Sequence, residues 1–442
     1  MPLTFSLQEI ADVCRGEVIG DESLNIHGIS IDTRTLQKGE LFVPLIAERD
    51  GHEYVREAFQ KGAKAHLFSH GSAHGNAIHV QDTLKAFQDM AKYARTKIQG
   101  EVIGITGSVG KTTTKDILYT CLSDHYQTVV SKFSHNNEIG VPLTLLSCDQ
   151  STEHVVLEMG ARGPGQIREL CEIASPTIGL VTQISAAHTE FFTDEEQVAL
   201  TKGELIESLQ ESGTAILNAE DHRVRSMASR TNAEVITFGF SDADVIAEDI
   251  ETDKNICGSF TLRTPWGIDA VKLNIPGVHN ISNALAAVSV GLKIGLDQST
   301  LVDSLSKIEL SPMRMDLRRT NSGTLVINDS YNANPASMNA AIDTLISVDA
   351  ETKIAVLGVM AELGDRSAAE HREIGKRLES ACSLVISVGV EEYGGIQVSS
   401  WQEALEELSK SDLLGNSSVV LVKGSRVAGL DKVAEALHND IR

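Results

Sequence analysis

Cysteine, tryptophan and positive charge are all scarce in this chain of 442 residues. The six cysteines show no C-x-x-C spacing, which argues against a disulfide framework or a cysteine zinc site; they are Cys14, Cys121, Cys148, Cys171, Cys257 and Cys382. The chain has 38 basic and 61 acidic residues, and a net charge of −23 argues against broad binding of nucleic acid or an anionic membrane. No apolar run approaches the roughly 20 residues that span a bilayer, and no leader pattern is present. We therefore expect a cytoplasmic protein without membrane insertion.

The pattern of apolar runs predicts an α/β fold of three domains. Residues 1–84 mix short helix and strand patterns typical of a small α/β domain. Over residues 85–312, apolar runs alternate with helical stretches, which predicts a mainly parallel sheet with crossover helices. A Thr-Pro-Trp-Gly turn after residues 259–262 predicts an added β-hairpin. The second α/β pattern, over residues 313–442, predicts a doubly wound, Rossmann-like C-terminal domain.

A glycine-rich turn between an apolar run and a helical stretch is the most informative motif. Such a turn cradles phosphate oxygens with backbone N–H groups, while its lysine reaches the β and γ phosphates and its hydroxyl ligates magnesium. The motif is shorter than the usual G-x-x-x-x-G-K-[ST] pattern, because Ile105 stands where the first glycine is expected. An ordinary strand-to-helix turn is the alternative. The preceding strand and the Lys-Thr pair favour a P-loop that binds ATP through Thr106, Gly107, Ser108, Val109, Gly110, Lys111, Thr112 and Thr113.

Three residues elsewhere in the central region could complete a metal site beside this loop. Glu158 ends an apolar run, so its carboxylate could hold magnesium with Thr112, although a strand-end glutamate taken singly is usually just solvated. His188 follows the next apolar strand, where a structural role and a metal or phosphate contact are both open. Lys202 would repel magnesium as an ammonium, whereas a carbamate formed with carbon dioxide would be an anionic, bridging ligand. Spacing alone does not reveal that modification.

Two clusters of polar side chains follow later in the chain. Asn280 and Asn283 lie three residues apart at the start of an expected helix, so one helical face can present both amides. Helix capping by Asn280 is the alternative. Asp329 ends a strand and begins a dense polar string, which makes it a candidate for binding a ribose hydroxyl or an incoming amine. A plain Asx-rich turn is the alternative there.

Together these motifs resemble the Mur ligases along essentially the whole chain. The segments that carry the resemblance are Ser30-Ile-Asp-Thr-Arg34, the P-loop, Asn136-Asn-Glu-Ile-Gly-Val-Pro-Leu-Thr144, Glu158-Met-Gly-Ala-Arg162, His188, Lys202-Gly-Glu204, His279-Asn-Ile-Ser-Asn283, Asp329-Ser-Tyr-Asn-Ala-Asn-Pro335 and Lys423-Gly-Ser-Arg426. The strings Asn-Asn-Glu-Ile-Gly-Val-Pro and Asp-Ser-Tyr-Asn-Ala-Asn-Pro are most similar to the family member that adds a dipeptide. The resemblance implies an N-terminal domain that holds a uridine nucleotide, a central ATPase, and a C-terminal domain that closes over ATP and presents the amine.

The resemblance also implies the reaction and its participants. ATP would phosphorylate the terminal carboxylate of UDP-N-acetylmuramoyl-tripeptide, and the amine of D-alanyl-D-alanine would attack the acyl phosphate, with ADP and phosphate released. Magnesium, at two sites, and lysine would neutralise oxyanion charge. A lysine carbamate would come from carbon dioxide, and a monomer without a nucleic-acid partner is expected.

Residue roles follow from the same resemblance. Lys111 would act on the transferring phosphoryl group, and the metal ligands would be Thr112, Glu158, His188 and carbamylated Lys202. Asn280, Asn283, Arg314 and Asp329 would contact ATP, and Ser30, Asp32, Thr33 and Arg34 would face the uridine diphosphate. The dipeptide or the domain interface would involve Asn136, Asn137, Tyr331, Asn332, Asn334, Lys423, Ser425 and Arg426.

Two departures from the family pattern concern substrate contacts rather than the reaction class. Ile46-Ala47 stands where related ligases often have Lys-Gly, and Ser134-His135 stands where Gly-Asn is expected. Two alternative functions also remain open. One is a ligase of the same superfamily that adds another amino acid, and the other is a nucleotide-binding regulatory protein that has lost catalysis. The presence of the full catalytic set favours the enzyme.

Overall fold

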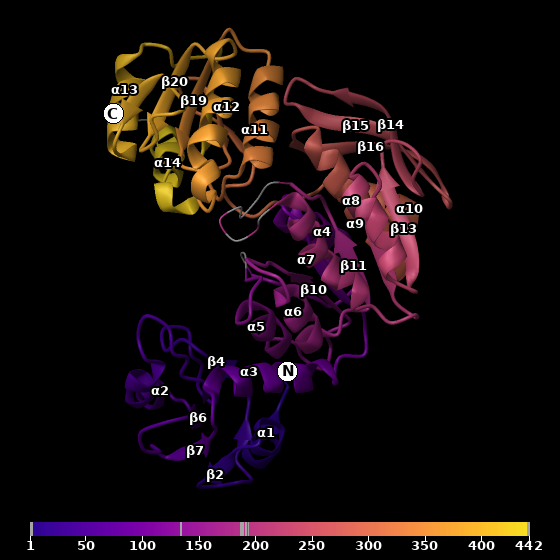
Figure 1. Cartoon of the computed structure of the whole chain (residues 1–442), viewed down its shortest axis with the longest axis vertical. Helices are drawn as coiled ribbons and strands as arrows, with labels where there is room; N and C mark the ends of the chain where they lie inside the picture. The colour runs from indigo at the N-terminus through magenta and orange to yellow at the C-terminus, as the bar shows by residue number, and fades with distance from the viewer. Residues whose placement is uncertain (1–2, 133–134, 186–189, 191, 193, 440–442) are drawn as a thin grey trace.

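The computed structural model describes residues 3–132, 135–185, 190, 192 and 194–439. Its three larger sheets follow one another along the long axis of the molecule, and each comes from a separate part of the chain (Figure 1). We call the parts the N-terminal unit (β1–β7), the central unit (β8–β16) and the C-terminal unit (β17–β22). This arrangement confirms the α/β class with three successive units.

The N-terminal unit contains a five-stranded sheet of order β2-β7-β6-β5-β4. Its strands are β2 (Glu17–Ile19), β4 (Ile29–Ser30), β5 (Leu41–Phe42), β6 (Ala65–Phe68) and β7 (Asn76–His79); β1 (Phe5–Ser6) and β3 (Asn25–Ile26) form a separate pair. The helices are α1 (Leu7–Cys14), η1 (Gly51–Tyr54) and α2 (Val55–Gln60). The helix α3 (Thr83–Arg95) follows, and its buried residues Phe87, Met90 and Ala94 belong to one hydrophobic cluster with Ile10 of α1 and Leu170 of the central unit. That continuous core joins the first two units.

The central unit has a nine-stranded sheet of order β16-β15-β14-β13-β12-β11-β8-β10-β9. Strands β8 (Val102–Thr106), β9 (Thr128–Val130), β10 (His154–Glu158), β11 (Ile178–Val181), β12 (Thr214–Asn218), β13 (Glu234–Gly239) and β14 (Val245–Thr252) are parallel. Antiparallel β15 (Cys257–Thr264) and β16 (Gly267–Pro276) confirm the expected hairpin, although it extends the main sheet through the unexpected β14. The helices are α4 (Lys111–Ser123), α5 (Gly140–Leu146), α6 (Gln166–Ala174), α7 (Glu195–Glu207), α8 (His222–Ser226), η2 (Met227–Arg230), α9 (His279–Ile294) and α10 (Gln298–Leu305).

The C-terminal unit is a doubly wound sheet of order β17-β18-β22-β19-β20-β21. Its elements are β17 (Asp316–Arg319), β18 (Leu325–Asn328), α11 (Pro335–Ser347), β19 (Thr352–Gly358), η3 (Gly364–Arg366), α12 (Ser367–Glu379), β20 (Leu384–Val388), β21 (Ile396–Val398), α13 (Trp401–Lys410), β22 (Ser418–Lys423), η4 (Arg426–Ala428) and α14 (Asp431–His438). Successive residues of β22 point to opposite faces, so Leu421 packs with α11 and α12 while Val420 packs with α13 and α14.

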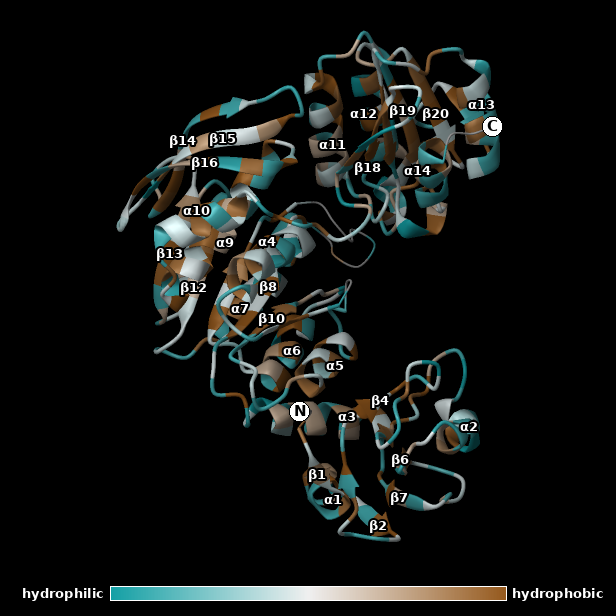
Figure 2. Ribbon diagram, turned by 180° about the vertical axis from the view of Figure 1, so that it is seen from behind, coloured by the Kyte–Doolittle hydropathy of each residue, from teal (hydrophilic) through white to brown (hydrophobic). Residues whose placement is uncertain are grey.

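Hydrophobic residues are concentrated in the strands and on the inward faces of the helices (Figure 2). Burial on both faces explains why the parallel strands have continuous apolar sequences rather than alternating ones. Among the described residues, no helix combines the length and the apolar character needed to cross a bilayer.

Candidate active site

The P-loop joins β8 to α4, and two of its glycines have backbone angles that other residues avoid. Gly107 has a φ of 145° and Gly110 a φ of 85°. A Cβ on Gly107 would lie 2.0 Å from Oγ1 of Thr182, and one on Gly110 would lie 2.5 Å from Oδ1 of Asn283. Glycine is therefore required at both positions. The resulting turn places backbone N–H groups at the N-terminus of α4, which is a favourable position for phosphate.

Glu158 and Thr112 form a buried polar pair beside this turn. The parallel pairing of β10 with β8 sets Glu158 opposite Ile105, so its carboxylate lies next to the P-loop. Thr112 Oγ1 donates to Glu158 Oε2 at 2.8 Å, and Asn136 Nδ2 donates to Oε1 at 2.9 Å. Glu158 is only 2% exposed. A buried carboxylate beside a hydroxyl provides the hard oxygen ligands that Mg²⁺ prefers, so these two residues fit a magnesium ion.

Two cationic side chains meet the same pair. Lys111 Nζ donates to the carbonyl oxygen of Gly107 at 2.6 Å, and burial lowers the pKa of this lysine. Arg314, from the segment that joins the central and C-terminal units, donates through Nη2 to Thr112 Oγ1 at 3.1 Å. Its guanidinium lies 4.3 Å from the centre of the Tyr331 ring, and its buried Nε has no hydrogen-bond partner among the described residues. Positive charge from α4 and from the segment that joins the central and C-terminal units therefore converges at the P-loop.

Lys202 lies on α7 and is 1% exposed. Burial, followed by the nearby charge of Lys111, lowers the pKa of the Lys202 amine to about 7. Lys202 is therefore not an ordinary solvent-facing charge on its helix. Of the three residues expected beside the loop, Glu158 and Lys202 are buried near it, whereas His188 lies outside the described residues.

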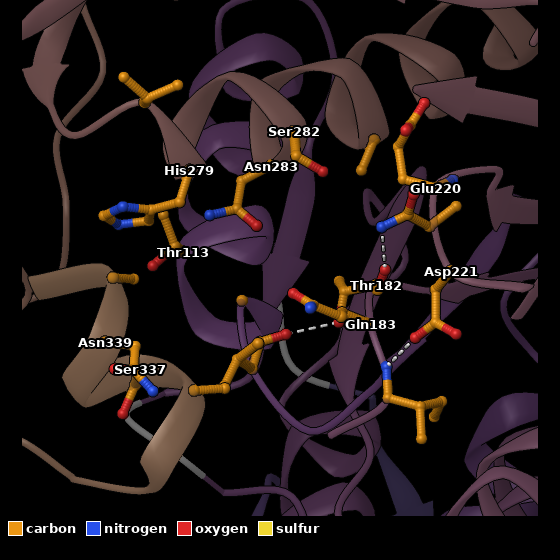
Figure 3. Close-up of a pocket in the computed structure, with 18 of the residues that line it drawn as sticks. Thr113, Thr182, Gln183, Glu220, Asp221, His279, Ser282, Asn283, Ser337 and Asn339 are labelled. Atoms are coloured by element: carbon orange, nitrogen blue, oxygen red, sulfur yellow. Dashed lines mark hydrogen bonds between the residues drawn. The ribbon is translucent and has the colours of Figure 1, made fainter. Parts of the chain in front are cut away.

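A cavity of about 650 Å³ opens beside the P-loop between the central and C-terminal units (Figure 3). Side chains from α4, α9, α11 and the loops after β11 and β12 surround it (Figure 3). The polar residues of its wall include Thr113, Asn218, Glu220, His222, His279, Ser282, Asn283, Arg314, Asp329, Ser337 and Asn339. Phe238, Phe240 and Val278 add an apolar surface. A concave site of this size with convergent polar groups suits a small ligand such as a nucleotide.

Asn283 lines this cavity, but Asn280 lies behind it. Asn280 is 1% exposed, and its Nδ2 donates to the carbonyl oxygen of Pro276 at 2.7 Å. Its Oδ1 accepts from Asn283 Nδ2 at 2.9 Å. Val278 occupies the N-cap position of α9, so the capping alternative for Asn280 is wrong. In this structure Asn280 orients the amide of Asn283.

A second cavity, of about 710 Å³, has Lys111 in its lining. From the sequence-predicted set it is lined by Lys111, Lys202, Asn136, Asn137, Asn332, Ser425 and Arg426. The structure adds Arg162, Glu362 and Val427, of which Val427 is 80% exposed. Gly110 lines the first cavity and Lys111 the second, so both cavities border the P-loop.

Asp329, Lys423 and Asn334 form part of the framework of the C-terminal unit. Lys423 Nζ donates to an Asp329 carboxylate oxygen and, at 2.9 Å, to the carbonyl oxygen of Asn332. Asp329 Oδ1 also accepts from the Met315 N–H at 3.2 Å. Asn334 is the N-cap of α11 and forms a capping box with Ser337. Asp329 and Lys423 still border the first cavity, whereas Asn334 lines neither cavity.

The residues expected to face a uridine nucleotide lie at the end of β4 and directly after it, and none lines either cavity. Asp32 accepts from the Arg34 guanidinium, with Nη2 and Oδ2 2.6 Å apart, and this contact lowers the pKa of Asp32. Ser30 Oγ donates to the carbonyl oxygen of Asp32 at 3.0 Å, and Thr33 Oγ1 donates to Glu57 at 2.8 Å. Ser30, Asp32 and Arg34 are therefore linked to one another, and Thr33 is linked to Glu57. All four residues lie at a distance from the P-loop along the molecule (Figure 1).

The departing residue Ile46 lies in a neighbouring loop, where it forms an isolated bridge with Asp50 and is 64% exposed. Asp50 accepts from His52 Nδ1 at 2.7 Å and contacts His70 Nε2 at 2.8 Å. The Ser69 N–H donates to His52 Nε2 at 3.2 Å, so Nδ1 carries the proton. Because neither His52 nitrogen is left to bind a metal, this histidine cluster does not fit a metal ion. The other departure, Ser134-His135, falls partly outside the described residues.

Two family models match most of the chain. The model described as the Mur ligase middle domain matches residues 105–291, and the one described as Mur ligase, glutamate ligase domain matches residues 313–426. The chain belongs to the Mur ligase family. Curated relatives named UDP-N-acetylmuramoyl-tripeptide--D-alanyl-D-alanine ligase include that of Bacillus subtilis, 35% identical over 84% of this chain and 82% of the relative. The Escherichia coli relative of the same name is 32% identical over 99% of both chains.

Solved structures support the same relationship for this Mur ligase. A crystal structure of MurF from Acinetobacter baumannii matches with a TM-score of 0.93 and 28% identity, over 99% of this chain and 100% of the other. MurF ligase from Thermotoga maritima in complex with ADP matches with a TM-score of 0.84 and 27% identity, over 93% and 97% of the two chains. The likeness includes all three units.

Several residues of the first cavity in this Mur ligase were not found from the sequence. Glu220 and His222 follow β12, whose carboxyl end lies at the same sheet edge as that of β8, and this position is a signal that the sequence contained. Ser337 and Asn339 lie on α11 of another unit. Nothing in their local sequence indicates that a helix from a separate sheet covers the P-loop.

Replacing Glu158 by glutamine is expected to weaken magnesium binding by this Mur ligase, raising the Mg²⁺ concentration for half-maximal activity by about 10-fold or more. The amide lacks the charge of the carboxylate and would bring its own N–H₂ group against Asn136 or Thr112. Magnesium titration of ATP-dependent phosphate release measures the effect. Glu153→Gln, at an exposed position beside the same strand, serves as the control and should behave as wild type. Equal magnesium dependence in both variants would contradict a metal role for Glu158.

Proposed function

We propose that this Mur ligase joins D-alanyl-D-alanine to UDP-N-acetylmuramoyl-tripeptide, forming the pentapeptide precursor of peptidoglycan. The observation that carries the proposal is that two cavities border the P-loop. One has the size and polar lining for ATP, and the other can hold a carboxylate and an amine close to the γ-phosphate. Relatives covering nearly the whole chain bear the name of that ligase.

The proposed reaction has two balanced steps. A carboxylate oxygen of the tripeptide attacks the γ-phosphorus of ATP, the bond to the β-phosphate oxygen breaks, and ADP leaves. The dipeptide amine then attacks the acyl carbon to give a tetrahedral intermediate. Collapse of that intermediate releases phosphate, the nitrogen loses a proton, and an amide remains. Both steps need alignment of two substrates and stabilisation of anionic oxygens.

The residues at the P-loop fit these requirements. The Lys111 ammonium moves from the Gly107 carbonyl to the phosphoryl oxygens, where it stabilises the charge that develops during transfer. Arg314 supplies a second cation from the C-terminal side of the first cavity, and Asp329 and Asn283 contact the nucleotide. Thr112 and Glu158 hold magnesium, which supplies Lewis-acid polarisation of phosphate oxygens when bound.

A carbamate on Lys202 belongs to the same proposal. The neutral amine nitrogen adds to the carbon of carbon dioxide and releases a proton, giving a carbamate anion. With His188, this anion provides ligands for a second magnesium. Burial favours the chemistry, because it disfavours the ammonium form that cannot react.

The three units have separate tasks in the proposal. Residues 1–84 hold the uridine diphosphate through Ser30, Asp32, Thr33 and Arg34, and residues 85–312 bind ATP. Residues 313–442 present the dipeptide and close over ATP. The residues near the dipeptide or the domain interface are Asn136 and Asn137 of the central part and Tyr331, Asn332, Ser425 and Arg426 of the C-terminal part. We further propose a monomer that acts in the cytoplasm.

Phosphate release from ATP tests the function directly. The assay contains UDP-N-acetylmuramoyl-tripeptide, in its diaminopimelate and lysine forms, and one amine from a panel of D-alanyl-D-alanine, D-alanine, L-lysine, diaminopimelate and glutamate. Turnover with D-alanyl-D-alanine alone is the expected result. Turnover with another amine would retain the mechanism and replace the substrate. If folded protein that binds ATP released no phosphate with any of the amines, a regulatory protein would be favoured.

A further inference from the structure

Two loops from different units meet at the second cavity. Arg162 lies four residues beyond the end of β10, and Glu362 lies four residues beyond the end of β19. Arg162 Nη2 is 3.0 Å from Glu362 Oε1. Among the described residues, no other ion pair joins the central and C-terminal units. Both residues line the second cavity together with Lys111 and Lys202.

The loop of residues 359–366, which we call the docking loop, has backbone contacts to the central unit as well. Glu362 adopts a left-handed conformation with φ of 62°, and its carbonyl oxygen accepts from the Glu190 N–H at 3.2 Å. Gly364 approaches so closely that a Cβ there would lie 3.3 Å from the Cα of Glu190. The docking loop is therefore seated on the central unit by several contacts around Glu362.

The same loop is bonded to the segment that borders the second cavity from the C-terminal side. The Ser425 N–H donates to the carbonyl oxygen of Val359 at 2.8 Å, and the Ala361 N–H donates to Ser425 Oγ at 2.9 Å. Arg426 and Val427 come next in the chain and line the cavity. Where the docking loop sits thus determines where residues 425–427 sit.

We propose that Arg162 is a positioning residue, whose ion pair with Glu362 seats the docking loop and so places residues 425–427 against the amine substrate. The inference rests on the proposed function, because it assigns the second cavity to the dipeptide. The side chains are 67% and 29% exposed, so solvent screens the pair and its effect is a few-fold rather than large. Loss of the pair therefore weakens use of the amine without disturbing the P-loop.

A double-mutant cycle measures this coupling. KM for D-alanyl-D-alanine is compared, at saturating ATP and UDP-tripeptide, among wild type, Arg162→Gln, Glu362→Gln and the double variant. Arg162→Gln should raise this KM by about 3- to 5-fold, the upper range for an exposed pair, while kcat and the KM for ATP change by less than about 2-fold. In the Glu362→Gln background the same substitution should have almost no effect, because the partner charge is already absent.

Arg168→Gln is the matched control. Arg168 pairs with Glu207 at 3.1 Å inside the central unit, with exposures of 59% and 37% that resemble those of the Arg162 pair. Its removal should leave the KM for the dipeptide unchanged. An equal KM increase in the control, or the same effect of Arg162→Gln with and without Glu362, would overturn the proposal.

Hydrogen exchange of the docking loop separates this inference from the proposed function. Backbone amides of residues 359–366 should exchange faster in Arg162→Gln than in wild type, and at the wild-type rate in Arg168→Gln. This measurement needs no turnover. If the wild type released no phosphate with any amine, the proposed function would fail. The hydrogen-exchange rates would still decide whether Arg162 seats the docking loop. Unchanged exchange in Arg162→Gln would overturn the seating role.

Discussion

Replacing Lys202 by alanine is expected to lower kcat by about 10²- to 10³-fold, comparable to the loss of one preorganised group that stabilises a developing oxyanion. The side chain is buried next to the P-loop, and its pKa of about 7 leaves much of the amine neutral near neutral pH. A neutral amine can add to carbon dioxide, whereas an ammonium cannot. Steady-state phosphate release measures the loss, and circular dichroism verifies that the variant is folded.

Chemical rescue distinguishes a carbamate from a simple positive charge. Alanine at position 202 leaves space in which a short carboxylic acid can take the place of the carbamate, so added acetate or propionate should restore part of the activity. Lys202→Met is the matched control, because its side chain fills the same space and leaves no room for the acid. Full activity of Lys202→Ala without any added acid would contradict a metal-bridging role for Lys202. Equal rescue of both variants would show that the acid acts elsewhere.

The proposed carbamate would have its own spectroscopic signature. Protein equilibrated with ¹³C-labelled bicarbonate should give a carbamate carbon resonance that Lys202→Met lacks. Because carbon dioxide reacts with the neutral amine, the signal should increase as the pH rises through about 7, the pKa of Lys202. An identical resonance in the methionine variant would assign the modification to another amine.

The sequence predicts those site residues whose position in the fold follows from the pattern of residues immediately around them. Gly107 and Gly110 indicate a phosphate-binding turn, and Glu158 ends the parallel strand next to β8. In a parallel sheet the carboxyl ends of neighbouring strands lie at one edge, so a strand-end carboxylate comes near the loop. The fold class could be predicted for the same reason, since apolar strands alternating with helices have few ways to pack.

The remaining geometry depends on contacts between distant segments, for which the sequence contains no local pattern. Ser337 and Asn339 reach the first cavity only because α11 of the C-terminal unit lies against it. The polar string after β18 was expected to bind a ligand, but one of its members has a structural role, since Asn334 caps α11. Motif resemblance places such residues near a substrate, but it does not distinguish a side chain that faces a cavity from one that holds a helix end.

Replacing Lys423 by methionine is expected to destabilise the C-terminal unit by about 3–5 kcal/mol, because it removes one partner of a buried ion pair. Lys423 and Asp329 have side-chain exposures of 2% and 12%. Methionine retains most of the volume of lysine, so the expected loss comes from the charge left on Asp329. Urea unfolding followed by Trp401 fluorescence, in a Trp266→Phe background that removes the other tryptophan, reports this unit.

A second substitution tests that explanation for the loss. Asp329→Asn in the Lys423→Met background removes the stranded charge and keeps an oxygen that can accept from the Met315 N–H. The double variant should therefore be more stable than Lys423→Met alone, by about 1–2 kcal/mol, since a neutral amide is much easier to bury than an unpaired carboxylate. Lys410→Met, which breaks the exposed pair with Glu407 in α13, should change stability by less than about 0.5 kcal/mol. If the double variant were no more stable than the single one, the loss would come from the missing Lys423 contacts to the Asn332 carbonyl rather than from unpaired charge.

The buried pair holds the Asp329 loop beside the first cavity, so its loss should reduce ATP use as well as stability.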